Sequence, residues 1–315
     1  MKEDNNFSPL ITSYTNIASV FSNVASPQMY QMYGDWLYLN YSNLCWNKQT
    51  NELIPCNYDN CDNYENIMNA PFLSVSTKSI DSLCNQNGET WINNGYSILL
   101  PINTHKMGIT QYNTYVHDVY LTEFINGCYR VFDFWQPRFK WDSRIVSSDL
   151  VHHSIDTTNA NLYNKIILMK HTKSDYFINY EMIRDSFHKF LERKTNKTTQ
   201  AVGIDVYSQF VEYIRNISSS TVLPATNFQI LVDHFTLLAY LLPHILKIKQ
   251  YCSQRTCDTV SEHTSFMMIQ ATKLRNYALK VWYSNKKNDS WREQIISALY
   301  ALENCERNLF ESISE

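Results

Sequence analysis

One stretch of this sequence, residues 115–135, constrains the fold more than any other, because it joins two β-type runs through a short turn signal. The runs Tyr115–Phe124 and Tyr129–Phe134 are rich in aromatic and β-branched side chains, and Ile125-Asn126-Gly127-Cys128 connects them. Asn-Gly between two such runs is the strongest short signal for a tight hairpin, since both residues readily adopt positive φ. The sequence therefore predicts an antiparallel hairpin here.

The predicted hairpin carries one imidazole and one carboxylate that can meet. Side chains alternate between faces along a strand, so His117 shares a face with Val119 and Leu121, and Asp133 shares one with Val131. We expect His117 and Asp133 to lie nearly opposite each other, with Cβ atoms roughly 4.5–5.5 Å apart. A base held by a third group is half of a nucleophile–base–orienter triad. The same pattern also fits a half-buried strand pair with an incidental His and Asp.

The hydrophobic period of the chain changes near residue 175. Before it we expect, in chain order, a helix within 10–25, a strand within 34–46, a mixed run at 71–80, a strand at 95–103, the hairpin, a connector at 141–150 and a strand at 162–170. After it, apolar stripes at helical spacing lie within 204–214, 228–242 and 295–313. The sequence therefore predicts an α+β domain over residues 1–172, followed by an all-helical domain over 173–315.

Composition narrows the classes of partner and compartment. The 315 residues include 27 basic and 30 acidic ones, and a net charge of −3 gives no field that would recruit nucleic acid. No apolar run reaches the roughly 18 residues of a membrane span, and the start MKEDNNFSPL is not a signal peptide. The eight cysteines are scattered, which favours reduced thiols and a cytoplasmic protein. Cys252, Cys257 and His263 are spaced more widely than usual zinc ligands, so we expect no metal site.

The order of these elements resembles that of papain-like cysteine enzymes, in which a helix near the N-terminus precedes a strand with His, a turn and a strand ending in Asp. Within that fold, the chain is similar to the butirosin-type acyltransferases, a family of cysteine-protease homologues in peptide-antibiotic biosynthesis. The segments that carry this resemblance are LLPIN at 99–103, YVHDVYLTEF at 115–124, YRVFDFW at 129–135, and the helical GIDVYSQFVEYI and FQILVDHFTLL.

The resemblance implies a papain-like domain built from a helix and an antiparallel sheet. It also implies an acyltransferase or amide synthase that moves an acyl or peptidyl group from a carrier-protein thioester to a small amine acceptor. No cofactor would be bound, and phosphopantetheine would enter as part of the carrier-protein substrate. By position His117 would be the base and Asp133 its orienter, with hydrolysis of the thioester as the side reaction.

The sequence departs from this pattern where the family has its nucleophile. No Cys precedes Cys45, and the helix entry reads SYTNIASVF, so Thr15 and Asn16 stand nearest the nucleophile position, with Ser13 and Ala18 adjacent. The Gln that papain-like enzymes use as an oxyanion donor is also missing. Three explanations remain open: a non-catalytic relative, amide formation without a covalent intermediate, or an engineered replacement of the nucleophile at Ala18.

Chemistry ranks direct His-assisted aminolysis, or a lost nucleophile, above catalysis by Thr15. A thioester is already activated, and one general base contributes typically 10²–10⁴-fold. A Thr hydroxyl is a far poorer nucleophile than a thiolate unless it is strongly activated. The alternative is a catalytically inactive homologue that binds or protects a carrier-bound intermediate. An ordinary peptidase is disfavoured by the missing Cys.

Three further residues near the hairpin are expected to contact substrate. Trp135 follows Asp133 closely, and His105 and Tyr115 precede or begin the His strand, where a loop could cover the site. In contrast, a His on an apolar helical stripe is usually a hydrogen-bonded structural group, and we expect this of His234.

Overall fold

The computed structural model divides into two compact units, which we describe separately. The first unit comprises Met1–Ser26 and Tyr64–Tyr176, and the second comprises Pro27–Asn63 and Phe177–Glu315. The structure describes residues 15–24, 27–57, 63–83, 87–109, 116–135, 140–155, 165–172, 180–192, 199–218, 225–248, 252–284 and 290–314.

The first unit is built on a six-stranded sheet in which every neighbouring pair of strands is antiparallel. Its elements, in chain order, are α1 (Thr15–Asn23), α3 (Asn63–Met68), β3 (Leu73–Ser79), α4 (Gly88–Asn93), β4 (Ser97–Asn103), β5 (Val116–Ile125), β6 (Cys128–Trp135), β7 (Lys140–Ser147), α5 (Ser148–Ser154) and β8 (Lys165–His171). The strand order is β3-β8-β4-β5-β6-β7. The predicted hairpin therefore lies within this sheet as β5 and β6.

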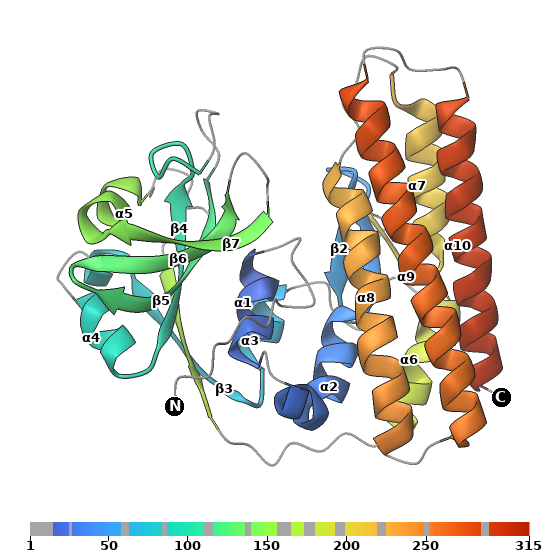
Figure 1. Cartoon of the computed structure of the whole chain (residues 1–315), viewed down its shortest axis with the longest axis horizontal. Coiled ribbons are helices and arrows are strands. Elements are labelled where there is room, and N and C mark those ends of the chain that lie inside the picture. The colour runs from blue at the N-terminus through green and yellow to red at the C-terminus, as the bar shows by residue number, and fades with distance from the viewer. Residues whose placement is uncertain are drawn as a thin grey trace. The chain divides into compact units, whose positions relative to one another are not determined.

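The two faces of this sheet are covered by different helices. One face carries the core of the unit, in which Val119 and Val131 pack in one cluster with Ile92 of α4 and Val151 of α5. The other face carries Tyr120, whose hydroxyl accepts a hydrogen bond from Asn23 of α1 at 3.0 Å. Figure 1 shows α4 and α5 on one side of the strands and α1 on the other.

The second unit combines helices with a small sheet. Its elements are α2 (Pro27–Tyr41), β1 (Asn43–Asn47), β2 (Glu52–Cys56), α6 (Tyr180–Glu192), β9 (Gln200–Val202), α7 (Asp205–Asn216), α8 (Ala225–Ile248), α9 (Gln254–Tyr283) and α10 (Trp291–Ser314). The strands form an antiparallel sheet in the order β2-β1-β9. Trp46 of β1 is 2% exposed and packs on Phe210 of α7, with ring centroids 5.1 Å apart, which joins the small sheet to the helices.

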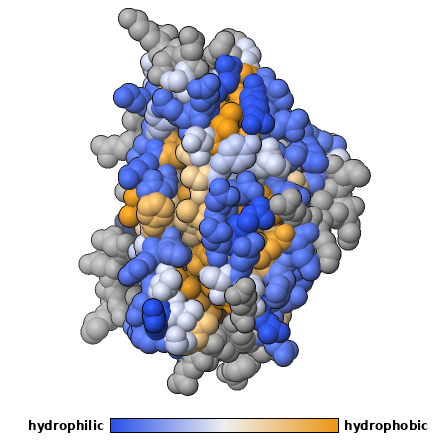
Figure 2. Space-filling view, turned by 90° about the vertical axis from the view of Figure 1, so that its right-hand side faces the viewer, coloured by the Kyte–Doolittle hydropathy of each residue, from blue (hydrophilic) through white to orange (hydrophobic). Residues whose placement is uncertain are grey.

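The helix α8 is the most apolar of this unit. Among the described residues, Ala225–Lys247 is the one helical segment that is long and apolar enough to cross a membrane. Most of that segment is buried inside the protein, as in the core helix of a bundle. Figure 2 shows orange apolar side chains in a broken band among blue polar ones. Exposed large apolar residues in the helical unit include Tyr240, Phe266, Ile269 and Tyr283.

Several expectations from the sequence are confirmed. The protein is α+β with antiparallel sheets and a helical C-terminal region. The first helix, the strand within 95–103 and the strand within 162–170 are present as α1, β4 and β8. The hairpin turn is also as predicted, since Asn126 and Gly127 both have positive φ, of 51° and 76°.

Two predictions of local structure were wrong. Residues 34–46 are not one strand but the end of α2 followed by β1. Tyr30, Tyr33, Leu37 and Tyr41 recur every three or four residues and are all buried, so a helical stripe determines this segment despite its short apolar alternation. The expected connector at 141–150 is strand β7 followed by α5, whose first turn is capped by the Ser147 hydroxyl accepting from the Leu150 amide.

The two units also differ from the division into residues 1–172 and 173–315. Residues 27–63 belong with the C-terminal helices, because β9 pairs with β1 and the Asn227 side chain of α8 accepts a hydrogen bond from the Leu53 amide at 3.0 Å. The C-terminal region is consequently not all helix. Its sheet contains two strands supplied by residues 43–56.

Candidate active site

His117 and Asp133 form a close hydrogen-bonded pair in the first unit. His117 Nε2 donates to Asp133 Oδ1 across a distance of 2.6 Å. The His117 side chain is 20% exposed and that of Asp133 is fully buried. A buried carboxylate that holds a partly exposed imidazole is the arrangement that orients a general base toward a substrate.

The pair is diagonal across the hairpin rather than directly opposite, which corrects the expected placement. The pairing of Tyr120 with Phe132 puts Val119 level with Asp133, so His117 lies two residues farther along the same face. Residue 117 is also farther from the turn than residue 133. The imidazole therefore reaches diagonally along the face to meet the carboxylate.

A β-bulge sets the side on which these two groups meet. On the turn side, Glu123 pairs with Arg130, and beyond it Leu121 pairs with Val131, so Thr122 is an extra residue in β5. A two-residue turn alone would pair odd-numbered residues of β5 with even-numbered residues of β6. Because the bulge adds one residue to β5, odd-numbered residues of both strands pair beyond it. His117 and Asp133 therefore share the face of the apolar core.

The electrostatics of the pair favour the protonated imidazole. Burial lowers the pKa of His117, but the charge of Asp133, its hydrogen bond to the ring and the smaller contribution of Asp118 together raise it. The net pKa lies above the ordinary 6.5. His117 is thus a stronger base than a free imidazole, and Asp133 stabilises the imidazolium that forms when His117 takes a proton.

Trp135 forms part of the core beside the pair. Its side chain is 5% exposed, its indole N–H donates to the Asp142 carbonyl at 3.1 Å, and the Arg144 guanidinium lies 4.4 Å over its ring. This geometry holds the indole in place on the same face as Asp133. A substrate contact by Trp135 stays a prediction.

The side-chain contacts of α1 lie on the sheet face opposite to that of His117. Asn23, in the last turn of α1, contacts β5 through Tyr120, whereas Ser19, one turn earlier, contacts Met169 on β8. Tyr120 and Met169 lie on the sheet face opposite to that of His117, because side chains alternate between faces along a strand. Ala18 is fully buried, and Thr15 and Asn16 form the first turn of the helix.

The remaining predicted residues fall in two groups. His105 is exposed in the turn after β4, where its amide donates to the Asn103 side chain at 3.1 Å. Ser13 and Tyr115 lie outside the described residues. The structure therefore unites two of the predicted site residues, His117 and Asp133, and connects them to Trp135 through one shared face.

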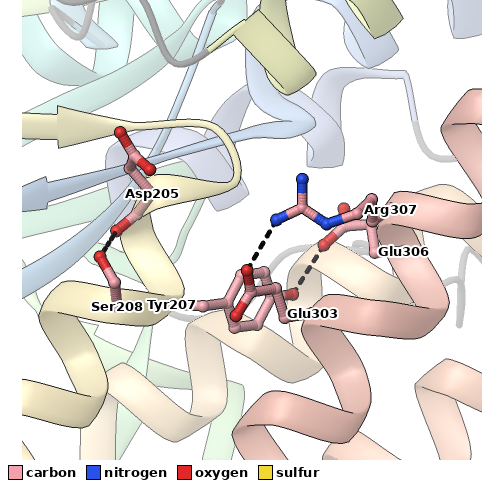
Figure 3. Close-up of polar contacts among 6 residues, drawn as sticks. All are labelled: Asp205, Tyr207, Ser208, Glu303, Glu306 and Arg307. Atoms are coloured by element: carbon pink, nitrogen blue, oxygen red, sulfur yellow. Dashed lines mark hydrogen bonds and ion pairs between the residues drawn. The ribbon is translucent and has the colours of Figure 1, made fainter.

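The helical unit contains a buried polar network that the sequence analysis recognised only in part. Glu306 of α10 accepts hydrogen bonds from Tyr207 of α7 and from His234 of α8, each at 2.6 Å, and all three residues are buried. Figure 3 shows Tyr207 directed at α10, near the ion pair of Glu303 with Arg307 at 2.8 Å. His234 is thus a hydrogen-bonded core residue, as expected. Its hydrogen-bond partner Glu306 lies 72 positions away in the sequence, so no local pattern identifies the pair.

Metal sites and reactive cysteines find little support among the residues that the structure describes. Within them, no three His, Cys, Asp or Glu side chains gather in a way that could hold a metal ion. Cys257 is buried and burial raises the pKa of its thiol, which makes it a poor nucleophile. Neither a protein-family model nor a curated protein matches this chain. The hydrogen-bonded His117 and Asp133 are consequently the arrangement from which a function can be argued.

Proposed function

We propose that the protein is an acyltransferase or amide synthase that transfers an acyl or peptidyl group from a carrier-protein thioester to an amine, with His117 as general base. The first unit would be a papain-like domain that works without a covalent enzyme intermediate. The setting would be cytoplasmic natural-product biosynthesis of the nonribosomal-peptide type. The acyl donor would be a phosphopantetheine thioester on the carrier protein, and the protein itself would hold no cofactor.

The hydrogen bond of 2.6 Å between partly exposed His117 and buried Asp133 carries this proposal. It supplies an oriented base whose pKa is raised by its carboxylate partner. The resemblance of residues 99–103 and 115–135 to butirosin-type acyltransferases supports the substrate class. The helix entry SYTNIASVF offers Thr and Ser hydroxyls and no thiol, which supports direct transfer over a covalent route.

The proposed reaction has one bond-forming and one bond-breaking event. The amine nitrogen attacks the thioester carbonyl, and His117 takes a proton from that nitrogen as the C–N bond forms. The C–S bond then breaks, and the departing thiolate receives the proton from the imidazolium. Because Asp133 engages Nε2, the proton transfers to substrate would run through Nδ1. Asp133 would stabilise the imidazolium between the two transfers.

The test is release of free thiol from an acyl-pantetheine thioester in the presence of a primary amine, with the amide product identified by mass spectrometry. His117→Ala should lower the rate by roughly 10²–10⁴-fold, the contribution of one general base. His188→Ala, which removes an exposed imidazole on α6, should leave the rate unchanged and is the matched control. Equal rates for His117→Ala and the unmodified protein would exclude the proposed role.

A second function, binding or protection of a carrier-bound intermediate without catalysis, is favoured by one observation. The contacts of α1, the helix on which papain-like enzymes place their nucleophile, lie on the sheet face opposite to that of His117. This alternative predicts a slower loss of the thioester when the protein is present, and no dependence on His117. The same thiol-release assay therefore separates the two functions.

A further inference from the structure

The helix α9 has two opposite faces that both follow a seven-residue repeat. Its inner face is buried against the helical unit, through Cys257, Val260, Thr264, Met267, Ala271, Leu274, Ala278 and Val281. Two positions after each of these buried residues, on the opposite side of the helix, lies an exposed one. This outer stripe consists of Thr259, Glu262, Phe266, Ile269, Lys273, Asn276, Lys280 and Tyr283. Alternating steps of three and four residues are the spacing of a helix that packs lengthwise on another helix.

The middle of the outer stripe is apolar and its flanks are charged. Phe266 and Ile269 are 52% and 49% exposed. Glu262 lies one step before them and Lys273 one step after them, and neither has an ion-pair partner among the described residues. Glu262 and Lys273 are 11 residues apart, about 16 Å along the helix, so they cannot pair with each other within one chain.

We propose that the outer stripe of α9 pairs antiparallel with the same stripe of a second copy of this chain. A two-fold axis midway between Phe266 and Ile269 places Phe266 of each copy on Ile269 of the other. The same axis brings Glu262 of each copy to Lys273 of the other, and Thr259 to Asn276. An isologous interface of this kind requires that residue i contacts j and that j contacts i, and the stripe meets this requirement in its three central layers.

The charge order of the stripe selects the antiparallel arrangement. In a parallel pair, Glu262 would face Glu262 and Lys273 would face Lys273, so both flanks would repel. In the antiparallel pair both flanks attract. One step before the stripe lies exposed Arg255, which would face Lys280 of the other copy. These like charges sit on long side chains that can extend into water. With only two large apolar residues from each copy, the association is expected to be weak and reversible.

The test measures association of the full chain by sedimentation velocity over a micromolar-to-millimolar range of concentration. The unmodified protein should dimerise reversibly. Glu262→Lys alone and Lys273→Glu alone should each weaken the dimer by about tenfold or more, because each variant creates two like-charge contacts. The double variant should restore the affinity. Glu212→Lys, the same charge change at an exposed site on α7, should have no effect.

Mixing the two single variants gives the sharpest result. At positions 262 and 273, one variant then carries two bases and the other two acids. A mixed dimer therefore has both flanks attractive and should form in preference to either homodimer. Native mass spectrometry of the mixture identifies that mixed dimer directly. A protein that stays monomeric throughout, or a dimer that Glu262→Lys does not weaken, would refute the proposal. Failure of the double variant to recover would also refute it.

Discussion

At the scale of single residues, the pair of His117 and Asp133 determines what the first unit can do. The imidazole is partly exposed and the carboxylate is buried, so a substrate can reach the base while water does not reach its partner. Asp133 opposes the effect of burial on the imidazole, which would otherwise lower its pKa and weaken it as a base.

The first prediction concerns the pKa of His117. It should lie above 6.5 in the unmodified protein and should fall in Asp133→Asn, which removes the charge and weakens the hydrogen bond that favour the imidazolium. Proton NMR titration of His-labelled protein, with His117→Ala to assign the resonance, measures both values. An Asp133→Asn variant in which the His117 pKa does not move would contradict the described pairing.

The raised pKa of His117 also determines how the unfolding free energy and the amide-forming rate depend on pH. Because the folded-state pKa is raised, stabilisation by the pair is fully present below pH 6.5 and is lost as pH rises through the folded-state pKa. The difference in unfolding free energy between the unmodified protein and Asp133→Asn should therefore shrink with rising pH. The amide-forming rate should change in the opposite direction and rise through that pKa, since the base must be neutral to take a proton.

Glu306 gives a prediction about stability in the second unit. Glu306→Ala leaves the Tyr207 hydroxyl and the His234 N–H buried without their acceptor, so it should lower the unfolding free energy by about 3–5 kcal/mol. Urea unfolding followed by circular dichroism measures the loss. Glu311→Ala, at an exposed site on the same helix, should stay within about 0.5 kcal/mol of the unmodified protein. Similar losses for the two variants would show that the network does not stabilise the unit.

At the scale of elements, the hairpin of β5 and β6 decides which side chains meet. The sequence predicts its turn because Asn126 and Gly127 adopt positive φ more readily than other residues. The bulge at Thr122 depends on the two strands matching their apolar faces to one core, which no local rule expresses.

Two single-residue deletions, one in each strand of the hairpin, test the role of the bulge. Deleting Thr122 removes the unpaired residue and leaves Glu123–Arg130 and Leu121–Val131 as consecutive pairs, so His117 should keep its raised pKa and its activity. Deleting Arg130 from the opposite strand should instead shift β6 by one residue and turn Asp133 to the other face. The NMR titration described above distinguishes them. Equal loss in both deletions would mean that the bulge itself holds the pair together.

At the scale of the whole molecule, the second unit is assembled from two separate parts of the chain. Residues 27–63 supply α2 and the β1–β2 hairpin, and they bury Tyr33, Tyr41, Trp46 and Leu53. Each large apolar side chain contributes roughly 1.5–3 kcal/mol when buried. Four of them contribute roughly 6–12 kcal/mol, which is close to the total stability of a typical domain.

A fragment comprising residues 173–315 should therefore not fold cooperatively, although it contains all the long helices from α6 to α10. Thermal unfolding followed by circular dichroism should give a broad transition for the fragment and a sharp one for the full chain. Adding residues 27–63 as a separate peptide should sharpen the transition of the fragment. A fragment that unfolds as sharply as the full chain would show that α2 and the small sheet are dispensable.

The sequence by itself determined the features that local chemistry controls. These are the turn at Asn126 and Gly127, the apolar stripes of α7, α8 and α10, and the presence of His117 and Asp133 on one hairpin. Each depends on residues within a few positions of one another, where backbone preferences and side-chain period act directly. The failure at 34–46 has the same origin, because a short aromatic-rich run satisfies both the strand and the helix period.

Only the tertiary structure decided which distant groups are neighbours. It placed α1 on the sheet face away from His117, joined Glu306 to His234 across 72 residues, and assigned residues 27–63 to the helical unit. These outcomes follow from burying apolar surface and pairing buried polar groups over the whole chain, and such interactions are not encoded in any single window of sequence.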